Sequence, residues 1–291
     1  KEYTHYSYFN WDSKEGRERI LAEKFGLGPA LLIFDELHKY TKWKNYIKGV
    51  FDTERDRLHM LVTGSARLDI YRRGGDSLMG RYHYYRLHPF SLAEALGTTT
   101  PGEKFGAPIG TELVFSDIAP QAGEMLQTLL EFGGFPEPFL SKDRGRLRRF
   151  QNDRVDRLIR DDIRDLESVR DLSSLQILAE LLPEKVGSLF SLNALREDLL
   201  VTHKTVAAWM DILERFYYHF RIYPFASTNI KSLRKEPKVY LWDWSPIKNR
   251  AHRFENLIAS HLLKMTHFLY DAQGYKAGLH FLRDRAGREV D

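Results

Sequence analysis

Two adjacent carboxylates follow a short apolar segment near the start of the sequence. Residues 31–34 are wholly apolar, and Asp35 and Glu36 come directly after them. A strand buried on both faces of a parallel sheet reads as a continuous apolar run, and open α/β sheets bind ligands beyond the carboxyl ends of their strands. Carboxylates at such an edge can hold a divalent cation and deprotonate a water molecule. The alternative is a strand that simply ends at a solvated loop.

A second apolar segment also ends in small polar residues. Residues 58–62 are predicted to form another buried strand, and Thr63, Gly64 and Ser65 follow it. A hydroxyl group at the end of a neighbouring strand can contact a phosphate or the attacking water. Further along, Gly80 and Arg81 precede an expected strand over residues 82–87, and the sequence Pro-Phe-Ser-Leu-Ala-Glu occupies residues 89–94.

The elements that must position these residues alternate along the chain. Strands are expected at 6–10, 31–34, 58–62 and 82–87, with helices at 15–24 and 43–57. This alternation predicts an α/β domain over residues 1–96. Residues 97–120 are rich in Gly, Pro and Thr, so a linker and a helical lid are expected over 97–170. Within the lid, apolar residues recur at helical spacing over 146–167.

Taken together, these pieces resemble the predicted AAA+ ATPases of archaea and bacteria. The shared pattern is an apolar strand with Asp-Glu, then a Gly-Ser segment, a Gly-Arg pair and the Pro-Phe-Ser-x-x-Glu sequence. The resemblance implies a P-loop NTPase core that uses ATP and Mg²⁺. Asp35 would then hold the Mg²⁺, Glu36 would be the catalytic base, Ser65 the sensor of the terminal phosphate, and Arg81 a stabiliser of phosphoryl charge. The alternative for Arg81 is a surface arginine in a basic loop.

The sequence departs from this family at the phosphate-binding loop. Such a loop needs the pattern G-x-x-x-x-G-K-[ST], and no Gly-Lys pair occurs in the 291 residues. In the family the loop precedes the strand that is expected here at residues 6–10. We therefore expect the natural protein to start upstream of Lys1, and this segment alone to bind nucleotide poorly.

Residues 171–245 are predicted to form a winged helix-turn-helix. Helices are expected at 172–182, 191–198 and 202–216, followed by strands at 217–225 and 238–242. Thr202 would cap the last of these helices, which places His203, Lys204 and Thr205 at the end that contacts DNA in recognition helices. The alternative is a module that contacts protein.

Residues 246–291 look like the start of a restriction-endonuclease-like α/β domain. A helix is expected at 253–264, with strands at 267–271 and 279–283. Glu255 and Asp291 match the first two acids that hold Mg²⁺ in that fold. The alternative is a packing module in which Glu255 only caps a helix.

Composition restricts the remaining choices. The 44 basic and 40 acidic residues give a net charge of +4, which permits nucleic acid as a partner without requiring it. The chain has no cysteine, which fits a reducing cytoplasm, and it shows no signal peptide or membrane span. The leading hypothesis is an ATPase that acts as a nucleotide-driven switch, with DNA or a second copy of the chain as further candidate partners. The alternatives are a DNA-binding or adaptor protein on a non-catalytic ATPase scaffold, and a metal-dependent nuclease.

Overall fold

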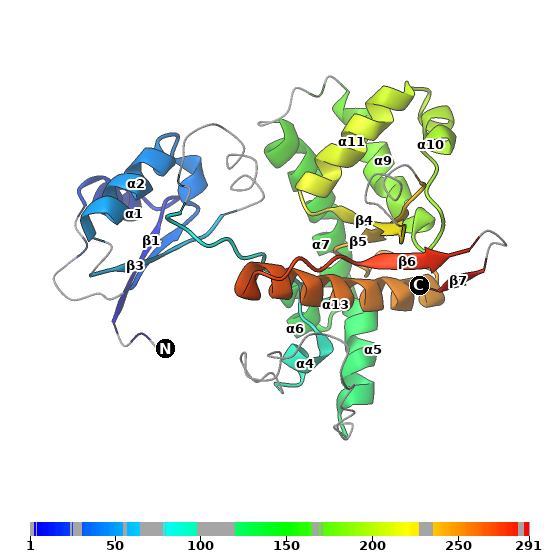
Figure 1. Cartoon of the computed structure of the whole chain (residues 1–291), viewed down its shortest axis with the longest axis horizontal. Helices are drawn as coiled ribbons and strands as arrows, with labels where there is room; N and C mark the ends of the chain where they lie inside the picture. Colours follow the sequence, from blue (N-terminus) through cyan, green and yellow to red (C-terminus); the bar gives the residue numbers. More distant parts are fainter. Residues whose placement is uncertain are drawn as a thin grey trace. The chain divides into compact units, whose positions relative to one another are not determined.

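The protein divides into two compact units, the first over Lys1–Tyr84 and the second over Tyr85–Asp291. In Figure 1 the first unit runs from blue to cyan and the second from cyan to red. The computed structural model describes residues 3, 5–23, 25, 31–54, 57–64, 78, 80–97, 120–164, 169, 171–226, 235–284 and 288–290.

The first unit is built on three parallel strands. They are β1 (Tyr6–Asn10), β2 (Leu31–Asp35) and β3 (His59–Val62), in the order β1-β2-β3, so β2 is central. Parallel neighbours need long crossover connections. The helices α1 (Lys14–Leu21) and α2 (Trp43–Glu54) lie in these connections, and the short η1 (Leu37–Lys39) follows β2. The strands and helices predicted for residues 6–62 are therefore confirmed.

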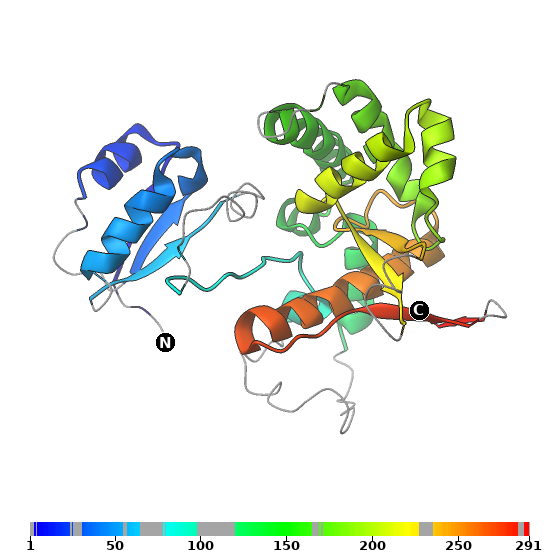
Figure 2. The same ribbon diagram turned by 45° about the horizontal axis from the view of Figure 1, so that its top comes forward.

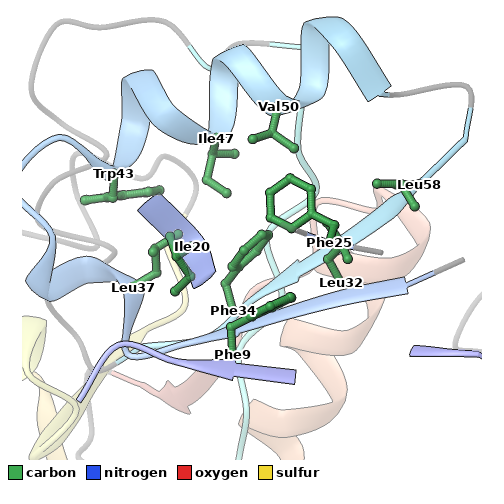
Figure 3. Packing of buried hydrophobic residues seen from close by; sticks show 10 residues of the cluster. All are labelled: Phe9, Ile20, Phe25, Leu32, Phe34, Leu37, Trp43, Ile47, Val50 and Leu58. Carbon is green, nitrogen blue, oxygen red and sulfur yellow. The ribbon is translucent and has the colours of Figure 1, made fainter. Parts of the chain in front are cut away.

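The core of the first unit lies on one face of its sheet. Phe9, Leu32 and Phe34 are almost fully buried there and pack against the two helices (Figure 3). On the opposite face Tyr8 and Leu61 are about half exposed, at 50% and 48%. The prediction that residues 58–62 form a strand buried on both faces is wrong. Among the described residues β3 is an edge strand, and only alternate side chains contact the core.

A glycine brings the start of α1 close to the end of β1. Ser13 caps α1 by accepting a hydrogen bond from the backbone amide of Gly16, at 2.8 Å. A Cβ atom on Gly16 would lie 2.1 Å from the backbone oxygen of Asn10, so only glycine fits. This turn places the residues after β1 at the carboxyl edge of the sheet.

The second unit is mainly helical. Its helical elements are α4 (Leu92–Ala95), α5 (Ala122–Phe132), α6 (Pro136–Ser141), α7 (Arg144–Arg157), η2 (Leu158–Ile163), α9 (Leu172–Lys185), α10 (Leu192–Leu199), α11 (His203–Arg215) and α13 (Arg250–Gln273). The helices α4, α5 and α6 precede α7. The helix α7 continues directly into η2, a turn of π-helix, and α9, α10 and α11 precede α13.

A mixed sheet forms the centre of the second unit. Its strands are β4 (His219–Pro224), β5 (Lys238–Leu241), β6 (His280–Arg283) and β7 (Glu289–Val290), in the order β5-β4-β6-β7. The β4–β5 pair is antiparallel, while β6 pairs with β4 in parallel. The sheet lies between α13 on one side and α9, α10 and α11 on the other (Figures 1 and 2). It therefore continues across the boundary suggested at Pro246.

Two predicted strands are wrong. Residues 267–271 belong to α13, which continues to Gln273 and ends at Gly274 with a positive φ of 75°. Residues 82–87 form no strand in the described part of the chain. The backbone amide of Arg86 instead donates to the carboxylate of Asp271, at 3.1 Å, and its guanidinium group binds the same carboxylate. A side chain on α13 thus replaces the strand partner that a sheet would supply.

Candidate functional site

The carboxyl ends of the three parallel strands bring polar side chains together in the first unit. The register pairs Asn10 with Asp35, and it pairs Phe34 with Val62, so Thr63 stands level with Asp35 on the next strand. The carboxyl edge of an open parallel sheet is where such folds bind ligands. Asp35 lies at the end of the central strand and is the middle of this group.

Neutral donors surround the carboxylate of Asp35. The hydroxyl of Tyr8 donates to its Oδ2 at 2.5 Å, the amide of Asn10 donates at 3.3 Å, and the hydroxyl of Thr63 donates to its Oδ1. The hydrogen bonds from Thr63 and Tyr8 hold the pKa of Asp35 below its ordinary value. The same contact with Asp35 raises the pKa of Tyr8. Asp35 is therefore ionised near neutral pH, and no described lysine or arginine forms an ion pair with it.

Glu36 occupies a left-handed turn directly after β2. Its φ of 56° and ψ of 22° are unusual for a residue with a side chain and cost about 1 to 2 kcal/mol. The turn leads into η1 and brings Lys39 to 3.1 Å from the Glu36 carboxylate. Lys39 also binds Asp12 at 2.6 Å, and this hydrogen bond raises the pKa of Lys39. The Glu36 side chain keeps 31% of its surface exposed, so water reaches it.

Of the other two predicted residues of the ATPase site, only Arg81 is described. Arg81 forms an ion pair with Asp52 at 3.0 Å, in the last turn of α2. Because α2 leads into the start of β3, this turn lies toward the edge opposite Asp35. Ser65 lies outside the described residues. The roles predicted for Arg81 and Ser65 both stay predictions.

The three residues predicted to contact DNA lie together in the first turn of α11. Thr202 caps the helix by accepting a hydrogen bond from the amide of Thr205 at 3.2 Å. His203 and Lys204 are exposed, whereas Thr205 is half-buried and its hydroxyl lies 2.8 Å from that of Thr202. The structure thus offers two exposed basic or polar side chains at this helix end.

The predicted nuclease acids do not form a described metal site. Glu255 accepts a hydrogen bond from Tyr240 at 2.8 Å and lies 3.6 Å from the ammonium group of Lys238. Asp291 lies outside the described residues. In the described part of the chain, no group of three or more His, Asp or Glu side chains is arranged to hold a metal ion. Through these contacts Glu255 joins α13 to β5.

Sequence reasoning missed three residues of the site around Asp35. Tyr8, Asn10 and Thr63 supply all the side-chain hydrogen bonds described for that carboxylate. The alternation of side chains along a strand already places Tyr8 and Asn10 on one face. The missing information was the register, which decides which strand ends meet.

Comparison with known families supports the α/β interpretation of the first unit. Residues 1–96 match the model of a family described as an AAA domain, and residues 123–255 match that of a domain of unknown function, DUF8612. No curated protein and no solved structure matches the chain. The first match, with the parallel sheet, supports a core like that of AAA-type P-loop NTPases and hence nucleotide binding.

The described helices do not meet the requirements of a membrane span. Among the described residues, none is both long enough and apolar enough to cross a bilayer.

Proposed function

We propose that the first unit takes part in ATP hydrolysis, with Asp35 holding Mg²⁺ and Glu36 activating the attacking water. One observation carries this proposal. An ionised carboxylate, held by neutral donors, stands at the carboxyl end of the central strand of a parallel sheet. Residues 1–96 also match an AAA domain, whose members use nucleotides.

The residues at this edge fit the metal and water parts of such a site. Mg²⁺ binds near nucleotides through one or two carboxylates, with water and phosphate oxygens completing its shell. Asp35 supplies a charged carboxylate, and its charge is free of any direct ion pair among the described residues. A phosphate cradle is not supplied by this sequence, because it holds no Gly-Lys pair.

Each residue has a definite task in this proposal. Bound Mg²⁺ would neutralise charge on the phosphate oxygens during phosphoryl transfer. Asp35 would hold the hydration shell of the cation, and Thr63 orients the Asp35 carboxylate through Oδ1. Glu36 takes a proton from the attacking water. For this step Glu36 must release Lys39, which lies 3.1 Å away and can remain bound to Asp12.

The substitution Glu36→Gln tests the proposal in the natural protein. It removes the proton acceptor but keeps the size of the side chain, so steady-state ATP hydrolysis should fall by a factor of about 100 or more. Nucleotide affinity, measured with a fluorescent ATP analogue, should change by less than about threefold. The control is Glu18→Gln, an exposed acid on α1 that pairs with Lys14. A Glu36→Gln protein that turns over ATP at the wild-type rate would remove Glu36 from the reaction.

Hydrolysis is further proposed to act as a switch on the second unit. The AAA match extends to residue 96, whereas the second compact unit already begins at Tyr85. Residues 86–94 are held to α13 by the Arg86–Asp271 ion pair and by the ion pair between Glu94 and Lys264. A change of state in the ATPase region can thus reach residues 86–94 through the backbone and α13 through these two ion pairs. If Glu36→Gln protein binds DNA equally well with ATP and with ADP, no such switch operates.

A second candidate function is contact with duplex DNA through α11. The chain passes through α9, a β-bridge between Leu189 and Lys238, α10, α11 and the β4–β5 pair, and this order supports the proposal of a winged helix. Exposed His203 and Lys204 at the start of α11 favour this candidate. The variant Lys204→Ala tests it by weakening duplex binding at low salt, and an unchanged affinity for duplex would exclude it.

A further inference from the structure

The positive charge of the chain is concentrated in one helical segment. Residues 144–164, which cover α7 and η2, contain eight arginines and four aspartates. Their local excess of four positive charges equals the net charge of +4 for the whole chain. A basic helix within a nearly balanced chain is typical of a surface that binds a polyanion.

One face of α7 lines a hollow of about 560 Å³. The lining residues of α7 recur at intervals of one, three and four, which keeps them on the same side of the helix. The other walls come from the start of α6, from η2 and from Phe216, which follows α11. The lining residues are Phe135, Glu137, Arg146, Arg149, Phe150, Asp153, Arg154, Arg157, Leu158, Asp162 and Phe216.

The arginines of the hollow fall into two kinds. Arg154 is fixed in the structure, because its guanidinium group lies 4.6 Å from the ring centre of Phe135 and donates to the backbone oxygen of Tyr217 at 3.2 Å. Arg146, Arg149 and Arg157 are exposed, and within the described residues their guanidinium groups pair with no carboxylate. These three remain available to an external anion.

Two aromatic rings lie beside these arginines. Phe135 and Phe150 are half-buried, with ring centres 5.6 Å apart and planes inclined at 45°. Aromatic rings next to a basic groove are the platform on which proteins stack the bases of single-stranded nucleic acids. Glu137, Asp153 and Asp162 line the same hollow and limit its net charge. The hollow therefore combines rings for a base with cations for phosphates.

We propose that this face of α7 binds single-stranded nucleic acid, with phosphates on Arg146, Arg149 and Arg157 and a base against Phe135 and Phe150. Arg146 and Arg157 are separated by about 16 Å along the helix axis, more than one phosphate group can span. A chain of phosphates fits this spacing better than a mononucleotide. In a duplex the faces of the bases are stacked on one another and cannot contact Phe135 or Phe150. Proteins recognise a duplex with elements that protrude into its grooves, which a hollow cannot do.

The proposal is tested by fluorescence anisotropy with a labelled oligothymidylate of about 12 nucleotides. Arg146→Ala combined with Arg149→Ala should weaken binding about tenfold or more at low salt. The same double variant should flatten the plot of log affinity against log salt by about 1.4, because each phosphate contact on a single strand contributes about 0.7. Both side chains are exposed, so the fold should tolerate their removal. The matched control is Arg148→Ala, an exposed arginine about half a turn away from the hollow, which should change affinity by less than about twofold.

Two further probes separate the sources of binding. An abasic oligomer of equal length has the same phosphates but no bases, so it should bind about tenfold more weakly than oligothymidylate. A duplex of the same sequence should bind through a different part of the second unit, and Lys204→Ala should affect that duplex and not the single strand.

Four results would overturn the proposal. The first is an equal affinity of the wild type and the double variant for the single strand. The second is a loss of affinity in Arg148→Ala as large as that in the double variant, which would indicate unspecific attraction. The third is binding of the abasic oligomer as tight as that of the single strand, or a loss of duplex affinity in the double variant as large as its loss for the single strand. The last is displacement of the oligomer by dTMP at an equal nucleotide concentration, which would point to a mononucleotide site.

Discussion

The two units differ in the groups that contact their ionised side chains. In the first unit, the charge of Asp35 is balanced by neutral donors, the hydroxyl groups of Tyr8 and Thr63 and the amide of Asn10. In the second unit, partly or fully buried charges meet opposite charges, as in the pairs Lys238–Glu289 at 2.6 Å and Arg86–Asp271 at 2.7 Å. A charged side chain that forms an ion pair contributes to packing. A charged side chain without an ion-pair partner is available to a ligand.

Each unit also contains the opposite case, and the exceptions are informative. Asp12 in the first unit is paired with Lys39, although it lies close to Asp35 in the fold. In the second unit, no carboxylate partner is found among the described residues for three exposed arginines of α7, Arg146, Arg149 and Arg157. An ionised side chain without an ion-pair partner is therefore a feature that the two candidate sites, Asp35 and the α7 hollow, share.

The largest effect on the free energy of unfolding should follow from removing a buried lysine that forms ion pairs. Lys238 is 3% exposed and contacts both Glu289 and Glu255. Lys238→Met leaves these carboxylates without their cation, so the free energy of unfolding of the second unit should fall by about 3 kcal/mol. Asp35→Asn should lower that of the first unit by about 1 to 2 kcal/mol, because it weakens the hydrogen bonds from Tyr8, Asn10 and Thr63 but breaks no ion pair. Chemical denaturation with each variant measures both values. Equal losses would break the comparison between the units.

A smaller effect should distinguish the two units by pH. His88 and His267 lie 2.8 Å apart in the second unit, and burial lowers the pKa of His88 to about 3 and that of His267 to about 4. Arg86 and Lys264 nearby lower the pKa of His88 further, while Asp271 opposes the shift at His267. Both rings are therefore neutral in the folded state at pH values where the unfolded state, with ordinary pKa values near 6.5, binds protons.

The sign of the effect follows from this difference. The stability that depends on the neutral rings is present above about pH 6.5 and is lost as the pH falls toward 4. The two histidines together should lower the stability of the second unit by about 2 kcal/mol between pH 7 and pH 5. The upper limit is about 1.4 kcal/mol per histidine for each pH unit below the unfolded pKa, and the partial exposure of both rings reduces it. Asp35, whose pKa is lowered, loses its contribution only below about pH 4. Denaturation curves at the two pH values test this, with Trp242 next to His88 as a probe.

The variant His88→Phe serves as the control for this pH effect. It keeps an aromatic ring against Trp242, whose centre lies 4.4 Å from that of His88, and it removes one titrating group. The loss between pH 7 and pH 5 should shrink by about 1 kcal/mol or more. An unchanged loss would assign the pH dependence to other groups, such as buried His219.

Most of the first unit could be predicted from the sequence. The apolar segment before Asp35 indicated a central strand, and the parallel order placed Asp35 and Glu36 at the ligand edge. The identity of the neighbouring hydroxyl could not be decided in the same way. Thr63 and Ser65 are both small and polar, and only the pairing of Phe34 with Val62 shows that Thr63 stands beside Asp35.

Contacts between distant parts of the chain explain the failures in the second unit. Residues 82–87 are rich in aromatic residues and read as a strand, yet Arg86 is held by Asp271, which is 185 positions away. The α7 hollow is a similar case. The spacing of Arg146, Arg149 and Arg157 could have indicated a basic helix face, but the facing ring of Phe135 comes from α6 and depends on tertiary packing.

The Mg²⁺ dependence of ATP hydrolysis tests the central claim most directly, because that claim is the availability of the Asp35 charge to a cation. In the natural protein, Asp35→Asn should raise the Mg²⁺ concentration needed for half-maximal turnover about tenfold or lower the maximal rate about 100-fold. Glu18→Gln is the control, because it removes an exposed carboxylate on α1 that pairs with Lys14 and takes no part in the proposed reaction, and it should shift the curve by less than about twofold. Identical Mg²⁺ curves for the wild type and Asp35→Asn would contradict the assignment of Asp35 as the metal-holding carboxylate.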